Sequence, residues 1–331
     1  MNTTSSSPLY SMSTTASELP ESDQDHPQVD AAKHAHPTGG RALVLGGGGS
    51  TGNAWLIGVM AGLYDAGLDV SAADLTIGTS AGSTAAAQIA GATPAELLAA
   101  ILAVAPQKRP VPAGSDRGGV RTKPVVDHLE RINKIIASSE DAADMRRRMG
   151  AAALEMEAAS DGSWQTQWRA TVASRLPSPD WPQRTVLITA VDARTGEPAV
   201  FDRDSGIDLA DAVAASCASG LPYRIGDNKY IDGGYRSNAE NADLAAGYGR
   251  VLVLSPFGGR SLAPLDWGVQ LAAQVDELRA NGSKVETIFP DSSSEHMFGA
   301  NAMDLSLRPP AAHAGYEQGK ALAGQLAEFW R

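Results

Sequence analysis

The chain alternates between short apolar runs and longer stretches in which apolar residues recur every three or four positions. The apolar runs at 41–45, 75–78, 185–191 and 250–255 have the length of buried strands. After the first run, apolar residues share one face of a predicted helix that ends near Gly67: Trp55, Leu56, Val59, Met60 and Leu63. Strands that alternate with helices predict a three-layer α/β/α fold with a mostly parallel central sheet.

The second half of the chain continues this pattern. A turn at 192–196 pairs the strand at 185–191 with residues 199–201, and residues 221–231 are typical of a turn followed by a strand. The remaining predicted elements are helices at 208–218, 265–280 and 311–330 and a strand at 285–290.

Two segments depart from the pattern. Residues 1–38 are polar and lack apolar periodicity, which predicts a disordered tail ahead of one domain at 39–331. Residues 106–182 are charged and contain prolines, and we interpret them as a helical cap inserted between two sheet units. Within this cap Trp164 and Trp168 would share a helix face, either packed on the domain body or in contact with lipid.

A serine between two glycines follows the second predicted strand. The sequence Gly78-Thr79-Ser80-Ala81-Gly82 has the spacing of a nucleophile elbow, in which a strand turns sharply into a helix and exposes the serine hydroxyl. A side chain at Gly78 or Gly82 would crowd the neighbouring strand or helix. The first amides of the helix would point at Ser80, where negative charge develops during acyl transfer. A glycine-containing turn beside an N-cap serine is the alternative.

A glycine-rich loop directly follows the first predicted strand. As Gly47-x-Gly49-x-x-Gly52 it matches a dinucleotide-binding fingerprint, but the second strand ends without the acidic residue that such a site uses. Consecutive glycines at a helix start also leave backbone amides free to converge on an oxyanion. We therefore assign Gly47, Gly48 and Gly49 to an oxyanion hole, with tight loop packing as the alternative.

An aspartate ends a later apolar run in the sequence Asp232-Gly233-Gly234. A serine hydroxyl attacks poorly until a base removes its proton. Asp232 could be that base if it is desolvated and within hydrogen-bond reach of Ser80, because burial raises the pKa of a carboxyl group. An Asp-Gly turn that closes a hairpin is the structural alternative, and both interpretations can hold together.

Together these stretches resemble the patatin-like phospholipase family in residues, order and spacing, over roughly 41–100 and 184–330. The resemblance implies a patatin-like fold and a serine–aspartate dyad that hydrolyses lipid acyl esters through an acyl-enzyme, without histidine, metal or organic cofactor. Ser80 would be the nucleophile and Asp232 the general base. The remaining motif glycines would support this geometry: Gly52, Gly78, Gly82, Gly233 and Gly234.

One position departs from the family pattern. Most members carry Arg or Lys before the last glycine of the first motif, where this chain has Thr51. An oxyanion hole made of backbone amides tolerates the change, but a fixed positive charge beside the site is lost. The preference for anionic phospholipid headgroups is therefore open.

Two other functions fit parts of the sequence. Ser80, Asp232 and then His296 or His313 follow the Ser…Asp…His order of an α/β-hydrolase esterase, although the serine of that fold normally follows more strands. The domain could also bind acyl chains or a partner without turnover.

Composition limits the classes of molecule that the protein is expected to bind. A net charge of −11 over 331 residues argues against nucleic acid and leaves an acyl-lipid or ester substrate. The single cysteine, Cys217, allows no internal disulfide, and we expect an inert core residue. No apolar run reaches about 18 residues and no secretory signal is visible, so we expect a cytoplasmic protein. Peripheral membrane contact through the cap is an open alternative.

Overall fold

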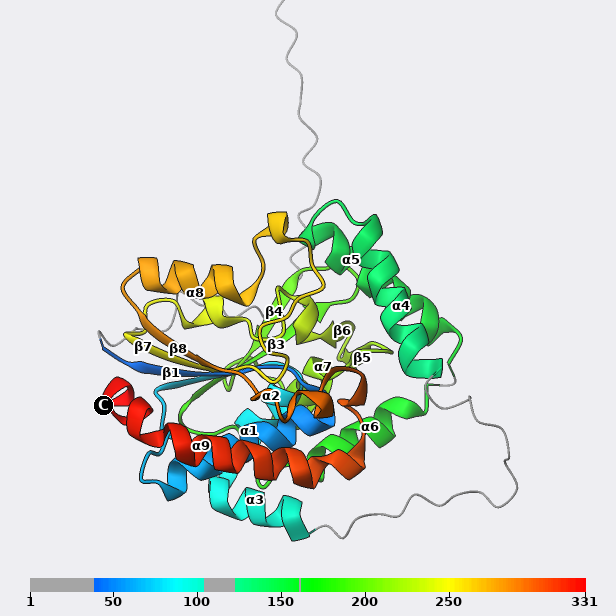
Figure 1. Ribbon diagram of the computed structural model, residues 1–331. Coiled ribbons are helices and arrows are strands. Elements are labelled where there is room, and N and C mark those ends of the chain that lie inside the picture. Colours follow the sequence, from blue (N-terminus) through cyan, green and yellow to red (C-terminus); the bar gives the residue numbers. More distant parts are fainter. Residues whose placement is uncertain (1–38, 104–122, 161) are drawn as a thin grey trace, which may run out of the picture.

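The computed structural model describes residues 39–103, 123–160 and 162–331. The predicted tail at 1–38 and residues 106–122 of the predicted cap lie outside these ranges. Within them the chain forms one eight-stranded sheet with helices on both faces (Figure 1). The predicted α/β architecture is therefore confirmed.

The strands agree closely with the apolar runs of the sequence. They are β1 Arg41–Leu45, β2 Leu75–Gly78, β3 Thr185–Asp192, β4 Pro198–Phe201, β5 Tyr223–Ile225, β6 Asn228–Asp232, β7 Arg250–Leu254 and β8 Lys284–Ile288. The α-helices are α1 Gly49–Asp65, α2 Ala81–Gly91, α3 Pro94–Ala103, α4 Lys123–Ser138, α5 Ala142–Ala158, α6 Trp164–Ala173, α7 Leu209–Ser216, α8 Leu271–Ala280 and α9 Arg308–Trp330.

The sheet order is β5-β6-β3-β2-β1-β7-β8, and β4 pairs with β3 off this path. Strands β3, β2, β1, β7 and β8 are parallel, whereas β4 and β6 run antiparallel to β3. Leu45 at the end of β1 lies opposite Gly78 at the end of β2. The segments that follow these two strands therefore begin side by side at one edge of the sheet.

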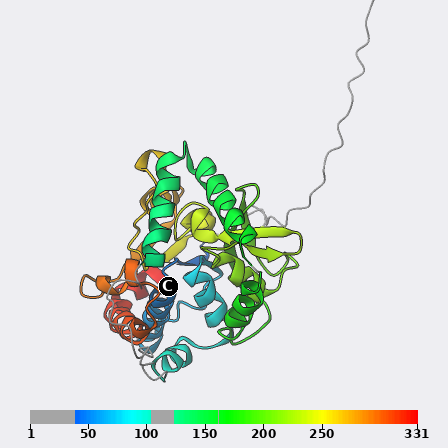
Figure 2. The same ribbon diagram turned by 90° about the vertical axis from the view of Figure 1, so that its right-hand side faces the viewer.

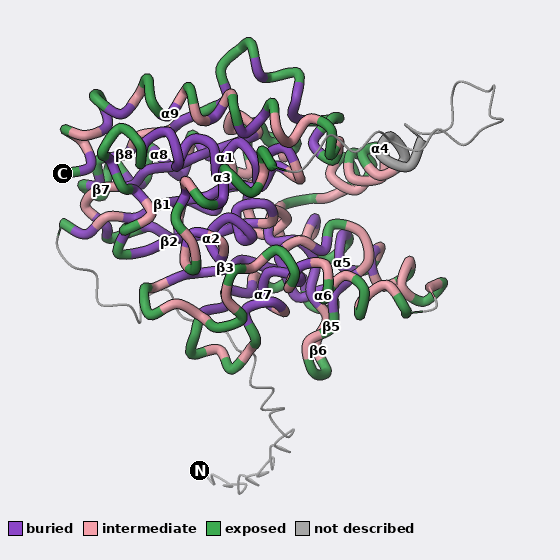
Figure 3. The backbone as a smooth tube through the Cα atoms, turned by 90° about the horizontal axis from the view of Figure 1, so that it is seen from below, coloured by how far each residue is buried: buried purple, intermediate pink, exposed green. Residues whose placement is uncertain are grey.

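Side chains alternate between the two faces of the sheet, as strand geometry requires. On β1, Ala42 and Val44 pack in the cluster that contains α8, whereas Leu43 and Leu45 pack in the cluster with α1, α2, α7 and α9. Figure 1 shows α8 on one side of the sheet and α1 and α9 on the other. Helix α1 is almost wholly buried because it lies between the sheet and α9 (Figure 3).

Helices α1 and α9 pack through glycines that let the two backbones approach closely. A methyl group placed on Gly58 would lie 2.1 Å from the carbonyl oxygen of Ala312, and one on Gly315 would lie 2.4 Å from that of Trp55. Helix α9 can therefore pack this closely on α1 only because the residues at the contact are glycines, which have no side chain. This close packing fixes the helix that starts at the glycine-rich loop.

Two helix starts differ from the sequence prediction. Helix α8 begins at Leu271 rather than 265, because Gly268 adopts a left-handed conformation (φ 65°) and ends a short 3-10 helix, η4 (Leu265–Trp267). Helix α9 begins at Arg308 rather than 311, and its two prolines occupy the first positions, where proline suits a helix. This earlier start places Arg308 at the helix terminus.

The helices of the predicted cap divide into two groups. Helices α4 and α5 lie side by side at one end of the sheet, as Figures 1 and 2 show. Helix α6 packs on α7, where the indole of Trp168 donates to the carbonyl of Ala214 at 3.1 Å. Trp164 and Trp168 thus pack against the domain body.

No single helix in the described ranges has both the length and the apolar character to cross a membrane; α2 and α3 meet the test only together, as a pair bent by 116°.

We predict that Gly58→Ala destabilises the fold by about 1–3 kcal/mol, because the added methyl group must displace the backbone of α9. Gly324→Ala is the matched control, since nothing lies within 4 Å of a methyl group at that position of α9. The control should stabilise by about 0.5–1 kcal/mol through the better helix propensity of alanine. Urea unfolding of both variants tests the close packing, and equal effects would contradict it.

Candidate active site

Ser80 occupies a strained backbone conformation between β2 and α2. Its φ of 53° and ψ of −116° lie outside the regions that residues with a side chain normally adopt. The Ser80 amide donates to Ser216 Oγ at 2.9 Å, and the Ser80 carbonyl accepts from Ser83 Oγ at 2.6 Å and Cys217 Sγ at 3.1 Å. These bonds hold the turn and leave the Ser80 hydroxyl free to face Asp232.

The glycines around Ser80 allow the sharp turn. A methyl group on Gly82 would lie 1.8 Å from the carbonyl oxygen of Leu45, and one on Gly78 would lie 2.6 Å from Ser83 Cα. The start of α2 therefore presses against the end of β1, which is the crowding that the sequence predicts. The serine turn and the glycine-rich loop meet because of this contact.

Asp232 lies at the end of β6, directly across from Ser80. The Ser80 hydroxyl donates to Asp232 Oδ2 at 2.9 Å, and the Gly234 amide donates to Oδ1 at 2.8 Å. Antiparallel pairing of β6 with β3 places Asp232 opposite Ala190, and the Asp232 amide donates to Ala218. The structure thus brings together the two residues that the sequence predicts as a pair, although they lie 152 positions apart.

Asp232 is buried, with only 7% of the residue exposed. Burial raises its pKa to about 6, although the bonds from Gly234 and Ser80 act in the opposite direction. A buried carboxylate that accepts few hydrogen bonds is more basic than an exposed one. Asp232 is therefore ionised at neutral pH and still basic enough to accept a proton.

The glycine-rich loop runs beside Ser80. A methyl group on Gly47 would lie 3.5 Å from Ser80 Cβ. The Gly47 amide donates to the carbonyl of Ala239 at 2.8 Å, so it is already engaged. The amides of Gly48 and Gly49 have no acceptor within the described part of the chain, and Gly49 has the positive φ (62°) that favours glycine.

Two buried residues that sequence reasoning missed, Asn241 and Thr189, fix the segment around Asp232. Asn241 Nδ2 donates to the Gly233 carbonyl and to Thr79 Oγ1, both at 3.0 Å, and so ties the turn after Asp232 to the segment before Ser80. Thr189 bonds Thr79 at 2.9 Å from β3. No local sequence pattern marks these contacts, because each joins residues from distant parts of the chain.

Two further buried groups border the site. Burial raises the pKa of the Cys217 thiol to about 11, so it stays protonated, as expected for an inert cysteine. Burial also raises the pKa of Glu240 to about 7, and its carboxylate accepts from Ser255 Oγ at 2.6 Å beneath Gly46. Neither group contacts the Ser80 hydroxyl.

The two histidines of the alternative esterase hypothesis lie elsewhere. His296 is exposed in the short 3-10 helix η5 (Glu295–Met297), where its ring contacts the carbonyl of Ser293. His313 is exposed on α9 and lines a surface groove with α3. Within the described ranges the hydrogen-bond partner of Ser80 Oγ is a carboxylate, and no group of three potential metal ligands occurs there.

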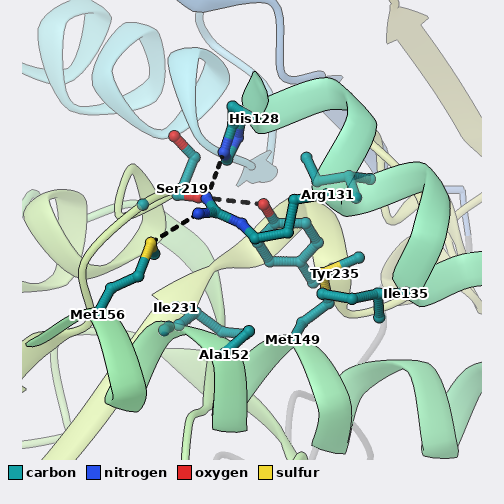
Figure 4. Close-up of a pocket in the computed structure, with 12 residues that line it drawn as sticks. His128, Arg131, Ile135, Met149, Ala152, Met156, Ser219, Ile231 and Tyr235 are labelled. Carbon is teal, nitrogen blue, oxygen red and sulfur yellow. Dashed lines mark hydrogen bonds between the residues drawn. The ribbon is translucent and has the colours of Figure 1, made fainter. Parts of the chain in front are cut away.

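A small pocket lies between α4, α5 and the segments that flank Asp232 (Figure 4). Arg131 donates to His128 Nδ1 at 2.8 Å and to Met156 Sδ at 2.7 Å, and the Tyr235 hydroxyl donates to the Ser219 carbonyl at 3.2 Å. The pocket volume is about 10 Å³, room for roughly one water molecule. The pocket as it stands is too small for an acyl chain.

A family model described as "Patatin-like phospholipase" matches residues 43–243. The matched range contains the glycine-rich loop, Ser80 and Asp232, and it identifies the chain as a lipid acyl hydrolase in general terms. The chain belongs to the patatin-like phospholipase family. A search of curated proteins finds no match.

Two solved structures are similar to this chain. VipD from Legionella pneumophila has 13% sequence identity and a TM-score of 0.38, with 87% of this chain and 67% of that chain covered. The type III effector protein ExoU has 15% identity and a TM-score of 0.34, with 87% of this chain covered. The match spans 53% of the length of ExoU.

We predict that Asp232→Asn stabilises the fold at pH 8 and changes its stability little near pH 4. The pKa of about 6 in the folded state lies above the ordinary value near 3.9, so ionisation on raising the pH opposes folding. The gain above pH 6 should be at most about 3 kcal/mol, since each pKa unit corresponds to about 1.4 kcal/mol. Urea unfolding at both pH values measures it.

Asp276→Asn, an exposed change on α8, is the control and should shift stability by less than about 0.5 kcal/mol at either pH. A loss of stability in Asp232→Asn that is the same at both pH values would contradict the assigned burial of a charged group.

Proposed function

We propose that this protein hydrolyses acyl esters of lipids with Ser80 as nucleophile and Asp232 as general base. The observation that carries the proposal is the 2.9 Å hydrogen bond from the Ser80 hydroxyl to a buried carboxylate, on a strained turn beside two free amides. Phospholipids, lysophospholipids and other acyl esters are the substrate classes within this proposal.

The proposed reaction begins when the ester carbonyl oxygen accepts hydrogen bonds from the Gly48 and Gly49 amides. Asp232 takes the proton of Ser80 as Oγ bonds to the carbonyl carbon, and negative charge moves to the carbonyl oxygen. When the carbonyl re-forms, the bond to the alcohol oxygen breaks and Asp232 returns the proton to that oxygen. An acyl-enzyme on Ser80 remains.

Hydrolysis of the acyl-enzyme repeats these steps with water in place of the serine. Asp232 accepts a proton from the water molecule, the water oxygen bonds to the acyl carbon, and the Ser80 oxygen leaves with the proton. The pKa of about 6 supports both proton transfers, because a base works best when its pKa lies near the operating pH. Loss of one oxyanion donor typically lowers such rates by about 10²–10³-fold.

The dinucleotide-binding interpretation of the glycine-rich loop gains no support from this geometry. Strand β2 ends at Gly78, and the loop faces the serine turn. An acidic residue for a ribose would be needed at the end of that strand.

We predict that Ser80→Ala abolishes hydrolysis of chromogenic acyl esters and labelling by a fluorophosphonate probe, because both need the serine oxygen. Asp232→Asn should slow both reactions by at least about 10²-fold through loss of the base. Ser138→Ala, an exposed serine on α4, is the control and should react as the parent protein does.

Circular dichroism should show that each variant is folded. A parent protein that binds acyl chains but never reacts with the probe would show a binding protein rather than an enzyme. Probe labelling that persists in Ser80→Ala would place the nucleophile elsewhere.

A further inference from the structure

Arg308 brings a guanidinium group to the glycine-rich loop from a distant part of the chain. It is the first residue of α9 and lies outside the range of the family model. Its Nη1 donates to the Ser50 carbonyl at 2.7 Å and to Ser50 Oγ at 3.1 Å, and its Nη2 donates to Asn53 Oδ1 at 3.2 Å. The guanidinium thus lies against the first turn of α1, which directly follows the glycine-rich loop.

The same contacts connect Arg308 to the serine turn. Asn53 Nδ2 donates to the carbonyl of Ala81, the residue after Ser80, at 3.5 Å, and to Gln88 Oε1 at 2.9 Å. Asn53 is buried between α1 and α2. One side chain therefore separates the guanidinium of Arg308 from the backbone of the nucleophile turn.

A second guanidinium group, that of Arg175, lies on the α6 side of this region. Gln88 Nε2 donates to the Arg175 carbonyl at 3.2 Å, and the Arg175 guanidinium stacks 5.7 Å from the ring centre of Trp168. Burial lowers the pKa of Arg308, and the charge of Arg175 lowers it further. The two positive charges therefore lie near enough to repel each other.

Neither guanidinium has a carboxylate partner within the described ranges, although the whole chain carries a net charge of −11. The Nε–H and one Nη2–H of Arg308 are left over after its three bonds. Arg308 is half-buried, whereas Arg175 is exposed. A partly buried cation near a second positive charge is costly, and a bound anion would relieve both the desolvation of Arg308 and its repulsion by Arg175. Arginine suits phosphate because its planar fork donates two parallel hydrogen bonds.

The surface beside Arg308, which together with Arg175 we call the cationic site, is apolar. Met303 and Leu305 are 66% and 61% exposed on the segment that leads into α9. A methyl group on Gly49 would lie 3.1 Å from Met303 Sδ, so this segment lies beside the glycine-rich loop. Exposed apolar side chains next to unpaired cations suit a molecule with both an anionic group and hydrocarbon, rather than free inorganic phosphate.

We propose that Arg308, assisted by Arg175, binds the phosphate group of a phospholipid substrate and positions its ester at Ser80. The proposal rests on the proposed function and names its substrate class. Arg308 supplies from α9 the positive charge that the first motif lacks, since Thr51 is fully buried and its hydroxyl has no partner within the described ranges. A neutral glycerolipid has no phosphate, so the two arginines would not increase its affinity.

The test compares octanoyl glycerophosphate with octanoyl glycerol, two substrates that differ only in the phosphate. The parent protein should prefer the phosphorylated ester. Arg308→Gln should lower kcat/KM for octanoyl glycerophosphate by about 10–100-fold, mainly through KM, and affect octanoyl glycerol much less. Arg308→Lys should recover part of the loss, because the charge returns without the planar fork.

Two further variants separate recognition from folding. Arg175→Gln should produce a smaller loss with the same selectivity, although Arg175 makes no bond to α1. Lys284→Gln, which removes an exposed positive charge at the opposite end of β8, should leave both substrates unaffected. Equal losses on both substrates in Arg308→Gln would show a structural role and overturn the proposal.

Binding is measured separately in the inactive Ser80→Ala variant. Calorimetry with octanoyl glycerophosphate should show binding that weakens about 10-fold or more when Arg308→Gln is added. This result can stand even if hydrolysis fails, so failure of the dyad and failure of the phosphate site are distinguishable. Tight binding of inorganic phosphate alone, without preference for the lipid, would show a free-anion site and contradict the proposal.

Discussion

The contact between Gly82 and the Leu45 carbonyl is the constraint on which the rest of the site depends. It forces α2 to start directly against the end of β1, so that the serine turn and the glycine-rich loop share one edge of the sheet. Ser80 then has no relaxed conformation available, and bonds from Ser216, Ser83 and Cys217 hold its strained backbone. The fold thus supplies a fixed hydroxyl beside free amides.

The burial of Asp232 couples stability to chemistry. The carboxyl group is desolvated by the same packing that directs it at Ser80, and its raised pKa is the result. A buried charge with few hydrogen bonds opposes folding, so the ionised form of Asp232, which the proposed reaction needs, makes the folded protein less stable. Asn241 and Thr189, which are buried and hydrogen-bonded to the neighbouring segment, keep that geometry in place.

Much of the fold and the motif positions could be predicted from the sequence, because local patterns specify them. Short apolar runs predicted the strands, and the glycines around Ser80 predicted the turn. The bonds from Asn241 and Arg308 could not be predicted, since they join segments that only the completed sheet brings together. The predicted start of α9 at residue 311 lies after the observed start at Arg308. Prolines end helices as readily as they begin them, so the two prolines did not identify the boundary.

The proposed role of the Asp232 carboxylate as the base for Ser80 is tested most directly by the pH dependence of kcat/KM at two temperatures. With Asp232 as base, kcat/KM should rise with pH through a midpoint near 6 that hardly moves with temperature, because carboxylic acids ionise with little heat. A midpoint that falls clearly on warming, as that of an imidazole does, and that persists in Asp232→Asn would contradict the account.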